Sequence, residues 1–286
     1  MSEGHYIAQQ SADTFERERL GLLERLADPI TLRRLQSLGV GVGWRCLEVG
    51  AGHGSIVRWL AQQVGPQGEV VATDLNPRFL RDLVEPNIIV HQHDILSDEL
   101  EDAHYDLVHC RFLLMHLSQP QRAAERMAKA VRPGGWLCLE ESDYSATRAA
   151  VSSHPLARRF TNKIRVAFDA LRAGGIMDPY FGRGVRGLVE GLGFVEVGHE
   201  GVTWINRGGE IGARFLQMGF ALGRRTWIAT GVLTEEDYGA LEQSYKDPSF
   251  TFVDQTLFGA WGRRPQQPIT AQLGTGSAAM NGLESK

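Results

Sequence analysis

The sequence predicts an α/β protein built on a doubly wound parallel sheet. Between residues 40 and 145, short apolar runs alternate with stretches whose apolar residues recur at helical spacing. Such alternation is typical of right-handed βαβ units, which place their strands parallel in one sheet. A glycine-rich loop directly after the first apolar run supports this fold, because doubly wound sheets bind ligands at that point.

The strands and helices of this core can be assigned in order. The apolar runs predict strands at 45–49, 69–74, 88–91, 105–110 and 136–140. The helix after the glycine loop covers residues 55–64 and ends at Gly65-Pro66. We expect Asn76 to cap the next helix. We expect Ser118 to cap the third helix through a capping box with Gln121.

Further helices flank the core on both sides. An amphipathic helix over 11–27 and a second helix opening at Pro29 form an N-terminal helical extension, residues 1–40. The main domain then covers residues 41–262 and carries a helical insert at about 150–190. From residue 263 the chain is rich in Pro, Gln, Gly and Ser, so we expect 263–286 to form a disordered tail.

Composition excludes several classes of protein. The chain has 286 residues, with 30 Lys and Arg against 34 Asp and Glu, which gives a net charge of −4. Nucleic-acid binders are usually basic, so we expect no nucleic-acid partner. No apolar run approaches the roughly 20 residues of a membrane helix, and no secretory signal is visible. Three separated cysteines without a C-x-x-C pair suggest buried thiols and a cytoplasmic location.

The glycine loop and three acids carry the chemical signal. Backbone N–H groups between a strand and a helix can face a ligand. The loop has glycines at 50, 52 and 54, and Ser55 stands where the dinucleotide fingerprint G-x-G-x-x-G needs a third glycine. Asp74 ends the second strand, where a carboxylate can accept hydrogen bonds from both hydroxyls of a ribose. Asp94 can meet an adenine amino group, and Glu48 can orient the loop or contact a cationic amino group.

In order and spacing these motifs resemble the class I S-adenosylmethionine-dependent methyltransferases. The matching segments are 47–54 (LEVGAGHG), Asp74, 93–95 (HDI), 105–108 (YDLV) and 132–135 (RPGG). The resemblance implies a Rossmann-like sheet of seven strands, the last antiparallel, with 194–205 and 250–261 as the remaining strands. Within the family, the chain most resembles methyltransferases that act on quinones and on secondary metabolites.

The resemblance also implies a cofactor and the residues that bind it. S-adenosyl-L-methionine would be the methyl donor and S-adenosyl-L-homocysteine the product. The glycine loop would wrap the methionine part, Asp74 would bind the ribose and Asp94 the adenine. Arg111 either contacts the cofactor or pairs with an acid, and Tyr6 either folds over the cofactor or is disordered. The full cofactor set is Tyr6, Glu48, Gly50, Ala51, Gly52, Asp74, Leu75, Asp94, Ile95 and Arg111.

The implied reaction is in-line methyl transfer to an O, N or C atom of a small, largely apolar molecule. A general base is needed only if the acceptor loses a proton. His116 is the first candidate, because a neutral imidazole suits that role near pH 7; a structural histidine is the alternative. Glu141 and Tyr144 are weaker candidates.

No metal is expected. His91 and His93 lack an obvious third ligand, and the acids at 140, 141 and 143 lack a carboxylate on the fourth strand. Three other functions stay open: a nicotinamide-dependent oxidoreductase, a non-catalytic cofactor-binding regulatory module, and an enzyme that uses the cofactor for another reaction. A homodimer through the N-terminal helices also stays open.

Overall fold

The computed structural model describes residues 13–266 and confirms the α/β class. Its sheet has eight strands in the order β3-β2-β1-β4-β5-β8-β6, and β7 pairs with β8 beside this path. Neighbouring strands from β3 to β5 are parallel, whereas β8 runs antiparallel to β5, β6 and β7. The strands are β1 (Arg45–Val49), β2 (Glu69–Asp74), β3 (Ile88–Gln92), β4 (Tyr105–Arg111), β5 (Val131–Asp143), β6 (Arg148–Ala149), β7 (Val195–Arg207) and β8 (Thr251–Arg263).

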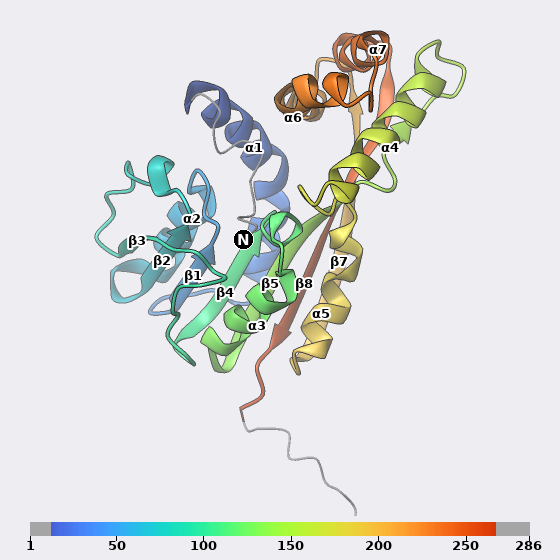
Figure 1. The fold of residues 1–286 in the computed structure, drawn as a ribbon. Coiled ribbons are helices and arrows are strands. Elements are labelled where there is room, and N and C mark those ends of the chain that lie inside the picture. Colours follow the sequence, from blue (N-terminus) through green and yellow to red (C-terminus); the bar gives the residue numbers. More distant parts are fainter. Residues whose placement is uncertain (1–12, 267–286) are drawn as a thin grey trace, which may run out of the picture.

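Helices cover both faces of the sheet, as expected for parallel strands that are apolar on both sides (Figure 1). On one face, α3 (Pro120–Ala130) and α5 (Val185–Gly191) bury Met127 and Val189 against Leu137. On the other face, the end of α1 (Asp13–Ser37) and α2 (Ser55–Val64) bury Leu35 and Leu60. The core therefore forms as the sequence pattern predicts.

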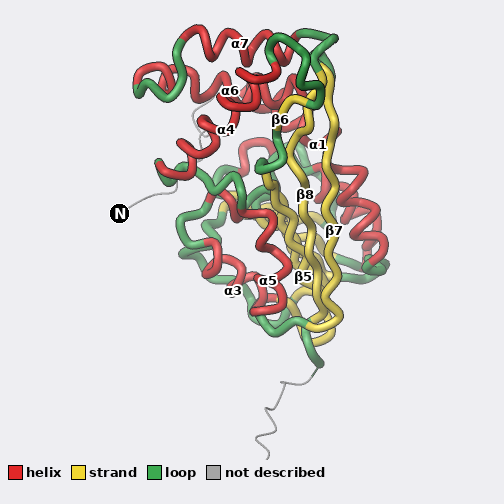
Figure 2. Tube along the Cα trace, turned by 90° about the vertical axis from the view of Figure 1, so that its right-hand side faces the viewer, coloured by secondary structure: helices red, strands yellow, loops and turns green. Residues whose placement is uncertain are grey.

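A second layer of helices stands beyond the carboxyl ends of the parallel strands. It consists of α4 (Ala157–Ala173), α6 (Ile211–Ala229) and α7 (Glu235–Lys246), around the far ends of β7 and β8 (Figure 2). Aromatic side chains fill its core, with Phe160 packed on Phe250 at 4.9 Å and on Phe252 at 5.3 Å between ring centroids. The long strands β7 and β8 thus extend into a group of helices above the sheet, α4, α6 and α7, which we call the helical chamber.

The structure corrects several local predictions. Pro29 lies inside one continuous helix, α1, so the second N-terminal helix is not separate. Asn76 precedes only a short 3-10 turn and makes no side-chain cap. The third helix begins at Pro120, after Gln119, without a side-chain cap from Ser118. The sheet has eight strands instead of seven, because the two-residue strand β6 adds to the β8 edge.

The ends of the described region can be placed as well. Arg263, the first residue of the expected tail, is the last residue of β8, and Arg264 N donates to the Gly135 carbonyl oxygen at 2.8 Å. Residues 267–286, which make up most of that tail, lie outside the described residues, as do 1–12. Within 13–266, no helix is long and apolar enough to cross a membrane.

Candidate active site

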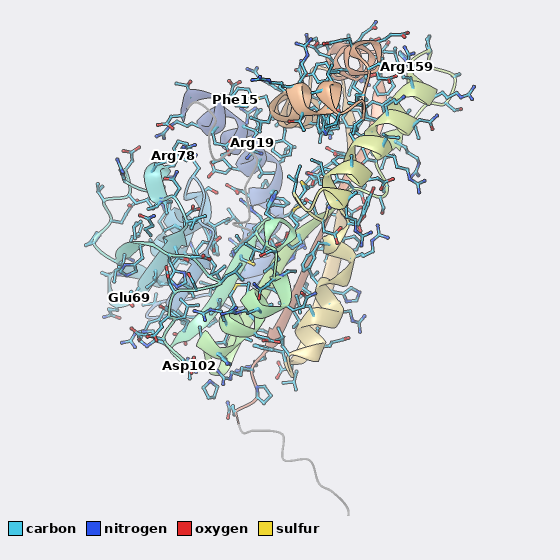
Figure 3. The ribbon with its side chains drawn as sticks, viewed as in Figure 1. Phe15, Arg19, Glu69, Arg78, Asp102 and Arg159 are labelled. Atoms are coloured by element: carbon cyan, nitrogen blue, oxygen red, sulfur yellow. The ribbon has the colours of Figure 1, made fainter. Side chains whose placement is uncertain are left out.

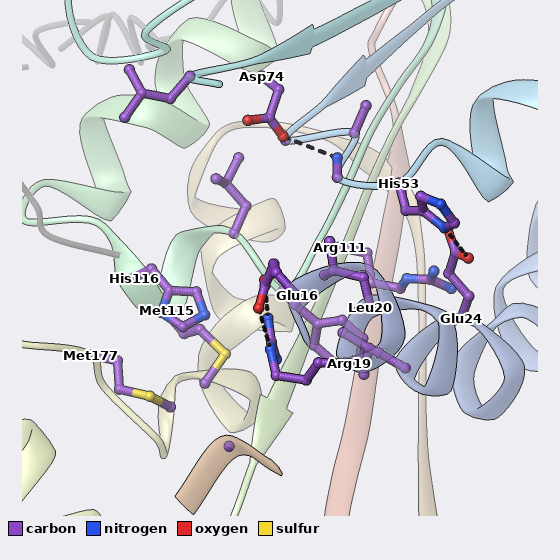
Figure 4. A pocket seen from close by; sticks show the side chains of 18 of the residues that line it. Glu16, Arg19, Leu20, Glu24, His53, Asp74, Arg111, Met115, His116 and Met177 are labelled. Atoms are coloured by element: carbon purple, nitrogen blue, oxygen red, sulfur yellow. Dashed lines mark hydrogen bonds and ion pairs between the residues drawn. The ribbon is translucent and has the colours of Figure 1, made fainter. Parts of the chain in front are cut away.

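A cavity of about 330 Å³ opens at the carboxyl ends of the parallel strands. It begins at the glycine loop after β1 and at Asp74, and it runs beneath α1 toward α4 and α6 (Figure 4). Figure 3 labels residues at both ends of the sheet: Arg19 and Arg78 lie toward the end with the cavity, and Glu69 and Asp102 lie at the opposite end. Ligands of doubly wound sheets bind at the carboxyl ends of the strands, so this cavity is the candidate site.

The glycine loop needs its glycines for two reasons. Gly50, Gly52 and Gly54 have φ values of 72°, 57° and 87°, a left-handed region that other residues rarely adopt. In addition, a Cβ atom on Gly50 would stand 3.1 Å from Leu113 Cδ1. The backbone N–H groups of Gly50 and Ala51 donate to the Thr73 carbonyl oxygen at 2.8 and 3.0 Å, which fixes the loop against the end of β2.

Asp74 braces the same loop from β2. One carboxylate oxygen accepts from Gly52 N at 3.0 Å and the other from Asn76 N at 2.8 Å. Burial raises the pKa of Asp74, while these two backbone hydrogen bonds oppose the shift. Each carboxylate oxygen has a further lone pair, so Asp74 can hold the loop and still accept from a ribose.

The next strand brings the other predicted cofactor residues to this cavity. Asp94 is half-buried and accepts from Leu96 N at 2.9 Å, and Ile95 is buried beside it. Leu75 lines the cavity with 47% of its surface exposed. The predicted cofactor residues that lie within 13–266 all line this one cavity; Tyr6 lies outside the described residues.

Helix α1 is tied to the loop and to β4 by charged side chains. Glu24 accepts from Ser55 N at 3.2 Å and contacts His53 Nδ1 at 3.0 Å. Asp28 accepts from Arg111 at 2.8 Å and from Ser55 Oγ at 3.1 Å. Of the two interpretations left open for Arg111, the structure shows the acid pair, although the residue also lines the cavity. Sequence reasoning missed these α1 partners, because a charged helix face looks solvated in sequence.

A buried polar network continues beneath α1. Glu48 contacts His109 Nδ1 at 2.6 Å, and His109 Nε2 lies 3.6 Å from Glu140. Arg34 and Thr31 of α1 both donate to Glu140. The sequence did contain a sign of this network, because Glu48, His109 and Glu140 are polar residues within apolar strand segments.

This network includes the one group of metal-ligand types found among residues 13–266, namely His109, Cys138 and Glu140. The Arg34 guanidinium pairs with Glu140 there. The positive charge beside these three side chains is therefore supplied by an arginine, and we interpret the group as a buried ion-pair network.

The part of the cavity that lies away from the glycine loop and the acids is apolar. Its walls carry the side chains of Met115, Tyr144, Phe168, Leu171, Met177, Phe215, Leu216, Phe220 and Trp227. The buried pair Glu16–Arg19 of α1 stands at the junction of the two halves, with nitrogen–oxygen distances of 2.9 and 2.7 Å. Pockets of this kind, mostly apolar with a few placed polar groups, take small molecules.

His116 lines the same junction (Figure 4). Burial, together with the nearby Arg19 cation, lowers its pKa to about 4, so the imidazole is neutral at pH 7. Glu141 beneath it is fully buried and accepts from the backbone N–H groups of Leu113 and Leu114 at 3.0 and 2.6 Å. Burial raises the pKa of Glu141 to about 8. Glu141 therefore holds the segment that presents His116 to the cavity.

Comparison with known proteins finds methyltransferases that are similar to this chain. The family described as "Methyltransferase domain" matches residues 47–137, from the strand before the glycine loop into β5. Over these residues the chain is similar to methyltransferases. Methyltransferase str2 of Strobilurus tenacellus is 28% identical over 182 residues, and str3 of the same fungus is 31% identical over 161 residues. The matches cover 63% and 55% of this chain, and the same shares of those relatives' own lengths.

Other known proteins are similar to this chain over the core sequence alone or in the fold alone. The ubiquinone/menaquinone biosynthesis C-methyltransferase UbiE of Laribacter hongkongensis is 32% identical over 113 residues, 37% of this chain and 46% of that one. Haemonchus contortus phosphoethanolamine N-methyltransferase 2, solved with S-adenosyl-L-methionine, has a TM-score of 0.54 at 15% identity, covering 93% of this chain and 61% of its own. YcgJ of Bacillus subtilis has a TM-score of 0.50 at 15% identity, covering 88% of this chain and all of its own.

Proposed function

We propose that this protein transfers a methyl group from S-adenosyl-L-methionine to an O, N or C atom of a small, largely apolar molecule. One observation carries the proposal: a single cavity joins the glycine loop, Asp74 and Asp94 at one end to an aromatic chamber at the other. A cofactor bound at the loop would therefore present its methyl group to an acceptor held in the chamber.

The cofactor half supplies matched partners for each part of S-adenosyl-L-methionine. We assign the ribose hydroxyls to Asp74, the adenine to Asp94 and Ile95, and the methionine part to the loop at Gly50 and Gly52. Glu48 is bound to His109 at 2.6 Å, so we assign it to positioning the loop from below. A relative of the same fold was solved with this cofactor, which supports the assignment.

The acceptor half supplies alignment and exclusion of water. A sulfonium methyl is already electrophilic, so the protein contributes by holding the acceptor in line and keeping the reaction dry. His116 is neutral at pH 7 and can take a proton from an acceptor that must lose one. The names of the str2, str3 and UbiE relatives support a small-molecule acceptor of secondary or quinone metabolism.

The remaining expectations form part of the same proposal. The net charge of −4 favours an acceptor that is not a nucleic acid. The three cysteines are free and buried, which favours a reducing cytoplasm. We keep a homodimer through the N-terminal helices as a prediction.

Calorimetric titration of the folded protein with S-adenosyl-L-methionine, and separately with S-adenosyl-L-homocysteine, tests the proposal. We expect saturable one-to-one binding of both, followed by methylated products in a mass-based acceptor screen. NAD serves as the control ligand, and we expect it not to bind. Absence of binding by both sulfur compounds would overturn the proposal, and binding of NAD alone would favour an oxidoreductase.

A further inference from the structure

One polar side chain stands out in the apolar half of the cavity. Gln255 of β8 lines the cavity and is only 1% exposed. Its amide oxygen accepts a hydrogen bond from Ser142 Oγ of β5. Its amide nitrogen, Nε2, has no hydrogen-bond partner among residues 13–266.

An unpaired buried N–H group is unusual and calls for a partner. Native proteins pair almost all buried polar groups, because an unpaired donor loses its water without compensation. Six other residues in the described range carry a buried side-chain atom without a partner, and of these His93 alone also lines the cavity. His93 lies beside Asp94, at the cofactor end. Among residues 13–266, Gln255 Nε2 is thus the one buried unpaired donor at the end of the cavity where the acceptor would bind, and a bound molecule can pair with it.

The place of Gln255 in the sheet tells which part of a ligand it would meet. Strand β8 lies three strands from β1 in the order β1-β4-β5-β8, and β1 carries the glycine loop. At the usual spacing of about 4.8 Å between strands, that is roughly 14 Å across the sheet. Gln255 therefore meets the far part of an acceptor, while the methylated atom lies nearer the loop and His116.

We propose that Gln255 is a specificity-determining residue that donates its amide N–H to an oxygen on the far part of the acceptor. This inference rests on the proposed function and narrows the substrate class. The acceptor is a flat, mainly aromatic molecule with a neutral oxygen acceptor, such as a carbonyl or ether, remote from the methylated atom. The rings of Tyr144, Phe168, Phe220 and Trp227 in the cavity walls fit its aromatic body.

A neutral oxygen is favoured over a carboxylate by the charges around the chamber. The donor is an uncharged amide, and the cation that lines the junction, Arg19, already pairs with Glu16 at 2.7 Å. The second cation that lines the cavity near β4, Arg111, pairs with Asp28. A carboxylate on the far part would thus lose its water for one amide N–H, which compensates a charge poorly.

The test uses two small probes of similar size, acetophenone and ethylbenzene, of which only acetophenone carries a carbonyl oxygen. Each is titrated calorimetrically into the full-length protein, with and without saturating S-adenosyl-L-homocysteine. We expect the wild type to bind acetophenone at least about 10-fold more tightly than ethylbenzene, since an unpaired buried donor discriminates strongly against a ligand that lacks its partner. In Gln255→Met, which keeps the length but removes the donor, the preference should fall below about 2-fold with ethylbenzene binding unchanged.

Thr147→Val is the matched control. Thr147 also has a buried, unpartnered side-chain oxygen, but it does not line the cavity, so this variant should keep the wild-type preference. Thermal unfolding separates a structural role from a binding role. We expect the midpoint of Gln255→Met to fall modestly, because the variant also removes the acceptor of the buried Ser142 hydroxyl. If that variant does not fold, Gln255→Met/Ser142→Ala, which also removes the hydroxyl left without an acceptor, replaces it.

The results that would overturn the role of Gln255 differ from those that would overturn methyl transfer. Equal binding of the two probes by the wild type, a preference that survives in Gln255→Met, or no binding of either probe would overturn the role of Gln255. The titration of S-adenosyl-L-homocysteine in the same samples tests the proposed function separately. Cofactor binding without discrimination between the probes would leave methyl transfer standing and remove only this inference.

Discussion

Asp74 is the single residue on which the cofactor assignment depends most. Its two oxygens already hold Gly52 N and Asn76 N, and we assign their remaining lone pairs to the ribose. We predict that Asp74→Ala weakens S-adenosyl-L-homocysteine binding by about 1.5–3 kcal/mol, the range for hydrogen bonds to a charged group. Calorimetry measures the loss. Asp102→Ala, an exposed acid at the opposite end of the sheet, should leave the affinity unchanged (Figure 3).

His116 allows a prediction about pH. Because its pKa is about 4, the imidazole is neutral at every pH from 6 to 8. For an acceptor that must lose a proton, we expect no titration of His116 in the rate profile over that range. His116→Asn should lower turnover roughly 10²–10⁴-fold, the usual contribution of a general base, without changing cofactor affinity. A turnover equal to the wild type in a folded variant would assign His116 to structure instead.

Glu141 links residue chemistry to stability. Its folded pKa, about 8, lies above the ordinary value of 4.5, so the folded state favours the protonated form. The stability that this preference contributes is fully present below pH 4.5 and is lost as the pH rises through 8. We predict that Glu141→Gln flattens the decline in the free energy of unfolding between pH 5 and 8. Urea unfolding at several pH values, compared with the wild type, measures this; an unaltered decline would contradict it.

At the scale of elements, the N-terminal helix α1 is the feature that the sequence described least well. Pro29 suggested a break, yet the helix continues because Asp28 and Arg34 on either side are fixed by Arg111 and Glu140. Those ion pairs join residues more than 80 positions apart, which no local pattern can show. The strands and the glycine loop were predictable, because apolar runs and left-handed glycines are local signals.

The Arg34–Glu140 pair should dominate the anchoring of α1. Both side chains are buried, at 1% and 0% exposure. We predict that Arg34→Met destabilises the protein by about 3–5 kcal/mol, since it leaves a buried carboxylate without its cation. Arg33→Met on the same helix removes an exposed partner of Glu200 and should cost less than about 1 kcal/mol. The double variant Arg34→Met/Glu140→Gln should recover much of the loss, and urea unfolding compares all four proteins.

At the scale of the whole molecule, the α/β core and the helical chamber share the long strands β7 and β8, and residues of both line one cavity. The core is similar to a methyltransferase family over residues 47–137, and the candidate acids Asp74 and Asp94, which line the cavity, were predictable from motif spacing. The chamber of α4, α6 and α7 carries no motif, and its aromatic residues have the spacing of any buried helix. Which of them face the cavity depends on how the helices cross, so Phe168, Phe215 and Gln255 could be assigned to it only from the structure.

This architecture predicts which elements become more stable when the cofactor binds. Helix α1 touches the glycine loop through Glu24 and Ser55, the cavity through Arg19, and the chamber where Arg19 lies over Phe215. A ligand that binds only the folded state stabilises it by about 2.7 kcal/mol at 100 times its Kd. We predict that saturating S-adenosyl-L-homocysteine slows amide hydrogen exchange in residues 50–55 and in α1 together, and leaves β7 unchanged. Glu24→Gln should weaken that shared protection in α1 while the loop remains protected, because the helix is then coupled to the loop by one charged contact fewer. Protection confined to the loop in the wild type would show that α1 does not respond to the cofactor.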